Sequence, residues 1–160
     1  MLNISLICAG RMREPHYIAA FSEYGKRLKA CCSFAFSEVP EARLPRAPSP
    51  AEIEAGLRHE AAEIARRIPA GARLIALCIE GERLSSEDLA GFFQKCANTG
   101  NSRICFLIGS SFGLDTGLKT KADLCLSMSA MTFPHHLARV MLAEQIYRGI
   151  MILEGGKYHK

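Results

Sequence analysis

Two irregular segments carry the residue types that can bind a small molecule through the backbone. The first is Gly109-Ser110-Ser111-Phe112-Gly113-Leu114, which follows the apolar run 103–108. The second runs from Ser127 to His135 and follows a further apolar run that begins at Leu124. In open α/β sheets, ligands bind outside the carboxyl ends of the strands. The sequence therefore predicts a pocket between these segments that is walled largely by backbone groups.

The elements that must position these segments alternate along the chain. Apolar runs at 4–9, 33–39, 73–79, 103–108 and from 124 predict strands. The other stretches predict helices that begin near Pro15, Pro50, Ser85 or Ser86 and His135, with one brief helix between 114 and 124. Strands that alternate with helices predict an α/β fold with a parallel-type sheet and helices on both faces. In 33–39 the alternation that places Phe34 and Phe36 on one face predicts a half-exposed or edge strand.

Two loops are also predicted at the carboxyl ends of strands. The stretch 40–50 has four prolines and includes Arg43 and Arg46, so neither a helix nor a central strand can run through it. The following helix starts at Ser49, where Glu52 completes a capping box. A second loop is expected at 80–83, around Gly81.

Composition sets the broad class. The chain has 160 residues, with 49% hydrophobic and 22% charged residues and a net charge of +4, as expected for one soluble domain at 1–160. No apolar run approaches the ~20 residues of a membrane span, and no signal peptide is expected. The seven cysteines form no C-x-x-C pair, which argues against disulfides and zinc. We therefore expect a cytoplasmic protein with no metal.

Common nucleotide motifs are missing. The turn after the first strand is Gly10-Arg11-Met12 rather than G-x-G-x-x-G, and Gly117-Leu118-Lys119-Thr120 has the wrong order for a phosphate loop. No H-E-x-x-H or G-x-S-x-G sequence occurs either. The residue pattern alone therefore leaves open a non-catalytic, flavodoxin-like nucleotide-binding module.

Four ordered motifs closely resemble the RlmH (YbeA-type) family. They are Gly109-x-x-x-Gly113-Leu114, the segment Leu126–His135, Arg139-Val140-x-Leu142-x-Glu144-Gln145-x-Tyr147-Arg148 and the terminal Tyr158-His159. These SPOUT-superfamily enzymes methylate N3 of a pseudouridine in 23S ribosomal RNA of the large subunit, using S-adenosylmethionine. The resemblance extends to the first strand and to Leu77-x-Ile79-x-Gly81. It implies a trefoil knot in the C-terminal half, a homodimer and ribosomal RNA as the partner. Because the net charge is only mildly positive, we expect the RNA to be recognised within a large preformed substrate, the assembled ribosome.

The resemblance also implies site residues. The cofactor would contact Leu77, Gly109 and the run Met128, Ser129, Ala130, Met131, Thr132 and Phe133. Because the acceptor imide must lose a proton, the candidate bases are His159, His135 and Glu144. Arg139 would stabilise the developing charge or hold a phosphate, and Tyr158 would stack on the target base. The tail would lie over a cofactor pocket, that of the partner subunit in a composite site.

Further expectations concern single residues. The family usually has two adjacent glycines in the first cofactor loop, where this chain has Ser110; a serine there costs ~1–3 kcal/mol of strain only if its φ is positive. This departure also leaves open a SPOUT-like RNA-binding protein that has lost its cofactor. His16, His59 and His136 are expected at the surface. The last helix is expected to bury spare apolar residues in a dimer, namely Leu142, Ile146, Ile150 and Ile152.

Overall fold

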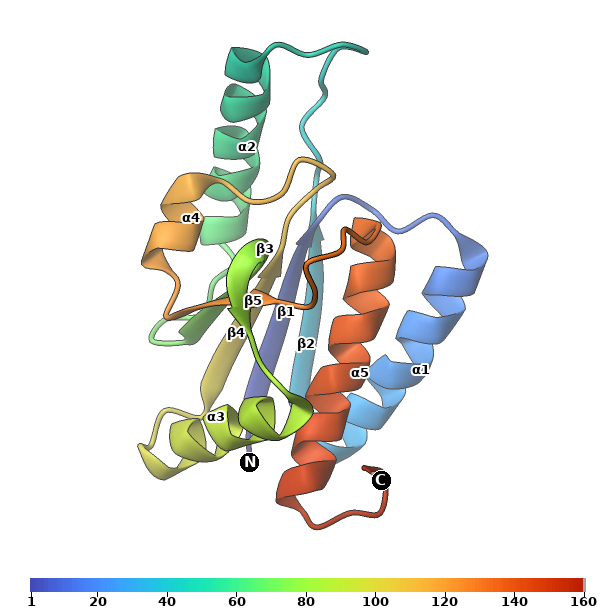
Figure 1. Cartoon of the computed structure of the whole chain (residues 1–160), viewed down its shortest axis with the longest axis vertical. Coiled ribbons are helices and arrows are strands. Elements are labelled where there is room, and N and C mark those ends of the chain that lie inside the picture. Colours follow the sequence, from blue (N-terminus) through green and yellow to red (C-terminus); the bar gives the residue numbers. More distant parts are fainter. Residues whose placement is uncertain (160) are drawn as a thin grey trace.

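The computed structural model describes residues 1–159 as a five-stranded parallel sheet with helices on both faces (Figure 1). The strands are β1 (Asn3–Ala9), β2 (Ser33–Val39), β3 (Arg73–Arg83), β4 (Arg103–Ile108) and β5 (Leu124–Ser127), in the order β2-β1-β4-β3-β5. The helices are α1 (Pro15–Cys31), α2 (Pro50–Ala65), α3 (Ser86–Asn98), α4 (Thr116–Lys121) and α5 (His135–Leu153). The predicted fold class is confirmed, and β2 is an edge strand as expected.

Two hydrophobic cores lie on the two faces of the sheet. Neighbouring residues of a strand point to opposite faces, so Leu6 of β1 enters the core with α1, α3 and α5, whereas Ile7 enters the core with α2 and α4. In β4, Phe106 and Leu107 divide between the cores in the same way. Burial on both faces explains why the central strands are continuous apolar runs rather than alternating ones.

The apolar residues of α5 serve this chain's own core. Leu142 and Ile146 are fully buried, Ile150 is buried and Ile152 is half-buried. The reason is that α5 packs against both α1 and α3 as well as the sheet (Figure 1). The expectation that these residues are spare positions for a dimer is therefore wrong for Leu142, Ile146 and Ile150.

The predicted loop at 80–83 is also wrong, because β3 continues to Arg83. Leu77 and Glu82 both pair with Leu126 of β5, with a shift of register between them. Gly81 permits this close approach, since a Cβ there would lie 2.6 Å from the carbonyl oxygen of Cys125. The glycine that suggested a turn thus allows two strands to touch.

Helix starts follow the predicted capping chemistry. The Ser49 hydroxyl accepts a hydrogen bond from the backbone N–H of Glu52, and the Glu52 carboxylate accepts one from the N–H of Ser49. Ser85, rather than Ser86, caps α3 in the same way with Asp88. Among residues 1–159, no helix is long and apolar enough to span a membrane. The trefoil knot stays a prediction.

Candidate active site

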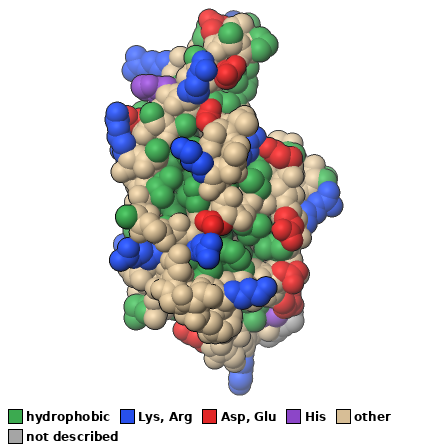
Figure 2. All heavy atoms as spheres, turned by 90° about the vertical axis from the view of Figure 1, so that its left-hand side faces the viewer, with side chains coloured by type: hydrophobic (Ala, Val, Ile, Leu, Met, Phe, Trp, Pro, Cys, Tyr) green, Lys and Arg blue, Asp and Glu red, His purple; other side chains and the backbone are tan. Residues whose placement is uncertain are grey.

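A cavity of about 620 Å³ lies where β3, β4 and β5 end. Its walls come from the end of β3, the loop 109–114, Lys119 of α4, and the loop from Met128 into the first turn of α5. The two segments singled out by sequence thus face the same cavity. Exposed apolar side chains surround it, including Ile79, Phe112 and Met131. Figure 2 shows the neighbouring face with α2 and α4, on which hydrophobic side chains lie exposed between charged ones.

The residues expected to contact a cofactor are brought together with one exception. Those that line the cavity are Leu77, Gly109, Met128, Ser129, Met131, Thr132 and Phe133. Ala130 is exposed and is not part of the lining. The loop is held by its own serines: the Ser127 hydroxyl donates to the Ser129 carbonyl (3.0 Å), and the Met131 N–H donates to the Ser129 hydroxyl (3.0 Å). The segment is therefore shaped before any ligand binds.

Gly109 forms a cradle that only glycine can form. A Cβ at this position would lie 2.1 Å from the Gly113 carbonyl oxygen and 2.8 Å from the Leu114 nitrogen. The loop closes on itself because the Gly113 N–H donates to the Ser110 carbonyl at 2.9 Å, and Gly113 has a φ of +87°. Both glycines are therefore required by the backbone path.

Ser110 is accommodated without backbone strain. No non-glycine residue in the described chain has a positive φ, so the strain considered for this serine does not arise. Its side chain is buried, and its hydroxyl donates to a carboxylate oxygen of Glu60 at 2.9 Å. Ser110, which replaces the second glycine usual in the family, thus makes a side-chain hydrogen bond that glycine cannot make.

Two opposite charges lie at the cavity. The Lys119 ammonium contacts the Glu80 carboxylate at 2.6 Å. The hydrogen bond with Lys119 lowers the pKa of Glu80, and the same bond raises the pKa of Lys119, so both side chains are charged at neutral pH. A lining with one cation and one anion suits a ligand that itself carries an amino and a carboxylate group.

His135 is the candidate base that faces the cavity. Its Nε2 atom is buried and has no hydrogen-bond partner among residues 1–159. Burial, followed by the charge of His136, lowers its pKa, which favours the neutral imidazole. The ring of His136 lies 4.1 Å from that of His135, and its Nδ1 is 2.8 Å from the Glu14 carboxylate. His136 is half-buried rather than a surface residue, whereas His16 and His59 are exposed as expected.

Arg139 does not line the cavity. It is fully buried, and its Nη1 contacts the Glu38 carboxylate at 2.7 Å while its Nη2 donates to the Gly10 carbonyl at 3.0 Å. It thereby joins α5 to the carboxyl ends of β1 and β2. A guanidinium without exposed surface cannot touch a phosphate, so the expected direct contact is wrong for the single chain.

The other candidate catalytic residues form a separate group, which we call the tail cluster: Glu144, Arg148, Tyr158 and His159. The Tyr158 hydroxyl donates to Glu144 at 3.1 Å, and the Arg148 guanidinium lies 4.7 Å from the Tyr158 ring centre. His159 Nε2 is 2.7 Å from the Glu87 carboxylate of α3. None of these residues lines the cavity of the same chain.

Comparison with known proteins identifies the family. The sequence profile of the family described as "Predicted SPOUT methyltransferase" matches residues 2–159. The chain belongs to the SPOUT methyltransferase family. This agrees with the glycine cradle and the backbone-lined cavity at the carboxyl ends of its strands.

Relatives of this SPOUT chain align along its full length. It is 41% identical to the ribosomal RNA large subunit methyltransferase H of Moorella thermoacetica, over 100% of both chains. It is 36% identical to the enzyme of that name from Listeria monocytogenes, over 99% of this chain and 100% of the relative. The probable methyltransferase structure from Bordetella pertussis shares its fold, with a TM-score of 0.54 at 15% identity, over 93% of this chain and 96% of the other.

Sequence reasoning missed several polar residues of the SPOUT site. Glu80 lies in a stretch whose sequence predicts a loop, and Lys119 lies in a stretch that does not match a phosphate loop. Glu60 follows Leu57 by three residues and precedes Ile64 by four, so it lies on the apolar face of α2. A carboxylate in that position was a visible signal of a buried polar contact.

Proposed function

We propose that this SPOUT chain is a cytoplasmic S-adenosylmethionine-dependent methyltransferase that acts on N3 of a pseudouridine in 23S ribosomal RNA. The observation that carries the proposal is the Gly109 cradle opposite the loop 128–135, in a chain 41% identical to a ribosomal RNA large subunit methyltransferase H over its full length. An adenosine requires an apolar slot with backbone donors and acceptors, and this lining offers both.

The cavity residues fit the two ends of this cofactor. Leu77, Met128 and Phe133 provide apolar contact for the adenosine, with backbone groups of the two loops between them. Glu80 and Lys119 offer opposite charges to the amino and carboxylate groups of the methionine part. When bound, S-adenosylmethionine supplies a methyl group already activated on a sulfonium. The protein must therefore align the acceptor and accept its proton.

Two histidines are suited to accept the acceptor's proton. His135 lies at the cavity in its neutral form, but its Nε2 is buried. His159 is 30% exposed at its side chain and lies in the tail cluster, outside the cavity of its own chain. A role for His159 therefore requires that the tail of one subunit reach the cavity of another.

We predict that the protein is a homodimer in solution, because the proposed site lacks its tail residues within one chain. Exposed apolar side chains on α1 and β2, namely Ile18 and Phe36, offer a surface for association. Light scattering at micromolar concentration should give twice the mass of one chain, 17.5 kDa. A monomer across the micromolar range would contradict the composite site.

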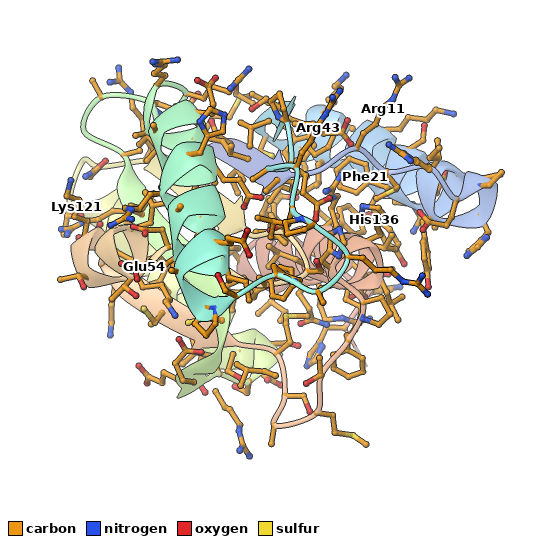
Figure 3. The ribbon with its side chains drawn as sticks, turned by 90° about the horizontal axis from the view of Figure 1, so that it is seen from above. Arg11, Phe21, Arg43, Glu54, Lys121 and His136 are labelled. Carbon is orange, nitrogen blue, oxygen red and sulfur yellow. The ribbon has the colours of Figure 1, made fainter. Side chains whose placement is uncertain are left out.

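A basic edge on the proposed RNA side leads to a further prediction. The loops after β1 and β2 carry Arg11, Arg13, Arg43 and Arg46, all exposed, and among residues 1–159 none of the four is in an ion pair with a carboxylate side chain. Because β1 and β2 are parallel neighbours, both loops leave the same end of the sheet (Figure 3). Exposed guanidinium groups at one edge suit RNA phosphates.

Replacing Arg43 and Arg46 together with glutamine is expected to weaken RNA binding. It should also lower the slope of log affinity against log salt by about 0.7 for each lost contact with single-stranded RNA. Fluorescence anisotropy at several salt concentrations measures both values. Arg58→Gln is the matched control, since Arg58 is an exposed arginine of α2 that is already paired with Glu54. Equal affinities and slopes for all three proteins would remove these arginines from the RNA surface.

The proposed function itself is tested by methyl transfer. Labelled S-adenosylmethionine should transfer its methyl group to assembled ribosomes, and the product should be lost when the target uridine is not isomerised to pseudouridine. Free 23S RNA, isolated large subunits and whole ribosomes, assayed side by side, identify the substrate. Binding of flavin mononucleotide instead of S-adenosylhomocysteine would favour the nucleotide-binding module.

A further inference from the structure

Glu60 is a buried carboxylate that joins two functional loops. It lies on α2, is 4% exposed, and burial raises its pKa. One carboxylate oxygen accepts a hydrogen bond from the backbone N–H of Ala42 at 3.0 Å. The other accepts from the Ser110 hydroxyl at 2.9 Å. A carboxylate is costly to bury, so its retention inside an apolar helix face calls for a role that a leucine could not fill.

The two partners of Glu60 belong to opposite sides of the site. Ser110 follows Gly109 in the loop that lines the large cavity. Ala42 precedes Arg43 in the proline-rich loop whose arginines form the basic edge. That loop is packed tightly on α2, because a Cβ on Gly56 would lie 3.1 Å from Leu44 and 3.2 Å from Ala42. Glu60 therefore links the two loops through one hydrogen bond to each.

A second cavity confirms how closely these parts adjoin. It has a volume of about 270 Å³ and is lined by Glu60 and Arg46 together with Ser110 and Phe112. The latter two also line the large cavity. The segment Ser110–Phe112 is thus the wall between the two cavities, and Glu60 holds one end of that wall. A change in the position of Ser110 therefore alters the walls of both cavities.

We propose that Glu60 is a positioning residue that holds the cofactor loop and the arginine-bearing loop in one arrangement, so that cofactor and RNA each favour binding of the other. Coupling of this kind is reciprocal, because each ligand stabilises the arrangement that the other requires. The RNA part of this inference rests on the proposed function. The effect on cofactor binding depends only on Ser110 and the cavity.

The test compares Glu60→Ala with Ser110→Ala and their double variant. Calorimetry with S-adenosylhomocysteine gives cofactor affinity, and anisotropy with the target RNA, with and without S-adenosylhomocysteine, gives the coupling. We expect Glu60→Ala to lower the affinities for S-adenosylhomocysteine and for RNA about tenfold each. In the wild-type protein each ligand should raise the affinity for the other about fivefold or more, and Glu60→Ala should abolish this coupling. Ser110→Ala should lower the affinity for S-adenosylhomocysteine, leave the affinity for RNA alone unchanged, and also abolish the coupling. The double variant should bind cofactor no more weakly than Glu60→Ala, since both changes break one link.

The controls separate positioning from general destabilisation. Glu63→Ala changes a glutamate of the same helix whose ion-pair partners among residues 1–159 are Arg66 and Arg67, and it should leave all affinities unchanged. Glu60→Gln should restore both affinities, because its amide oxygen can accept from Ala42 while its NH₂ group donates to the Ser110 oxygen. Wild-type coupling in Glu60→Ala overturns the proposal. If Glu60→Ala does not fold, wild-type coupling in Ser110→Ala overturns it equally. Failure of the wild-type protein to bind either ligand would instead overturn the proposed function.

Discussion

Gly109→Val is expected to abolish cofactor binding while most of the fold remains. The first side-chain carbon already collides with the backbone of Gly113 and Leu114, so the loop cannot close over the cavity as it does now. No rotamer can relieve this clash, because the obstructing atoms are backbone. We expect affinity for S-adenosylhomocysteine to fall at least about 100-fold, which corresponds to roughly 3 kcal/mol. Gly109→Ala should have the same effect.

Gly91→Ala is the matched control for this substitution. Gly91 lies in α3, and a Cβ added there meets no heavy atom within 4 Å. Calorimetry should give wild-type cofactor affinity for Gly91→Ala and no measurable binding for either Gly109 variant. Circular dichroism checks that the sheet and helices remain. Unchanged affinity in Gly109→Val would place the cofactor in another part of the molecule.

Those parts of the fold that depend on local pattern could be predicted from sequence. Ser49 with Glu52 fixes the start of α2, and the apolar run 103–108 fixes a strand buried on both faces, because each signal lies within a few residues. The extension of β3 could not be predicted this way. It depends on the contact of Gly81 with Cys125, residues that are distant in sequence.

In the site, too, features set by local sequence could be predicted, and features set by contacts between distant residues could not. The loops after β4 and β5 are recognisable because glycine and proline interrupt apolar runs, and their residues do line one cavity. The partners of the charged residues are set by packing instead. Arg139 is recognisable as part of a motif, yet only the fold shows that it faces Glu38 beneath the surface. The separation of the tail cluster from the cavity likewise depends on how α5 packs.

His159→Ala is expected to lower turnover by ~10²–10⁴-fold, the usual range for the loss of a general base. Cofactor affinity should change little, because in the proposed reaction His159 acts on the acceptor base rather than on the cofactor. Single-turnover methylation of ribosomes measures the rate, and calorimetry measures the affinity. His16→Ala is the matched control, since His16 is an exposed histidine with no hydrogen bond among the described residues.

A wild-type rate in His159→Ala would transfer the role of base to His135. That histidine has a distinct pH signature. Its pKa is lowered from 6.5, mainly by burial, and the neutral imidazole is the form that accepts a proton. Activity that depends on His135 is present above this lowered pKa and is lost as the pH falls through it. The acid limb of the rate profile would then lie below pH 6.5, and His135→Ala would remove it.

The composite site predicts that two inactive variants rescue each other. In a mixed dimer of Gly109→Val and His159→Ala subunits, the His159→Ala subunit has an intact cavity and the Gly109→Val subunit has an intact tail. If each tail serves the partner's cavity, one of the two sites is complete. Random association of equal amounts should then restore about a quarter of wild-type activity, since half of the dimers are mixed. If the tail serves its own cavity, no site is complete and the mixture stays inactive. Coexpression with two affinity tags gives the purified mixed dimer, and a single-turnover assay then distinguishes these outcomes: about half of wild-type activity if each tail serves the partner's cavity, and no activity if it serves its own.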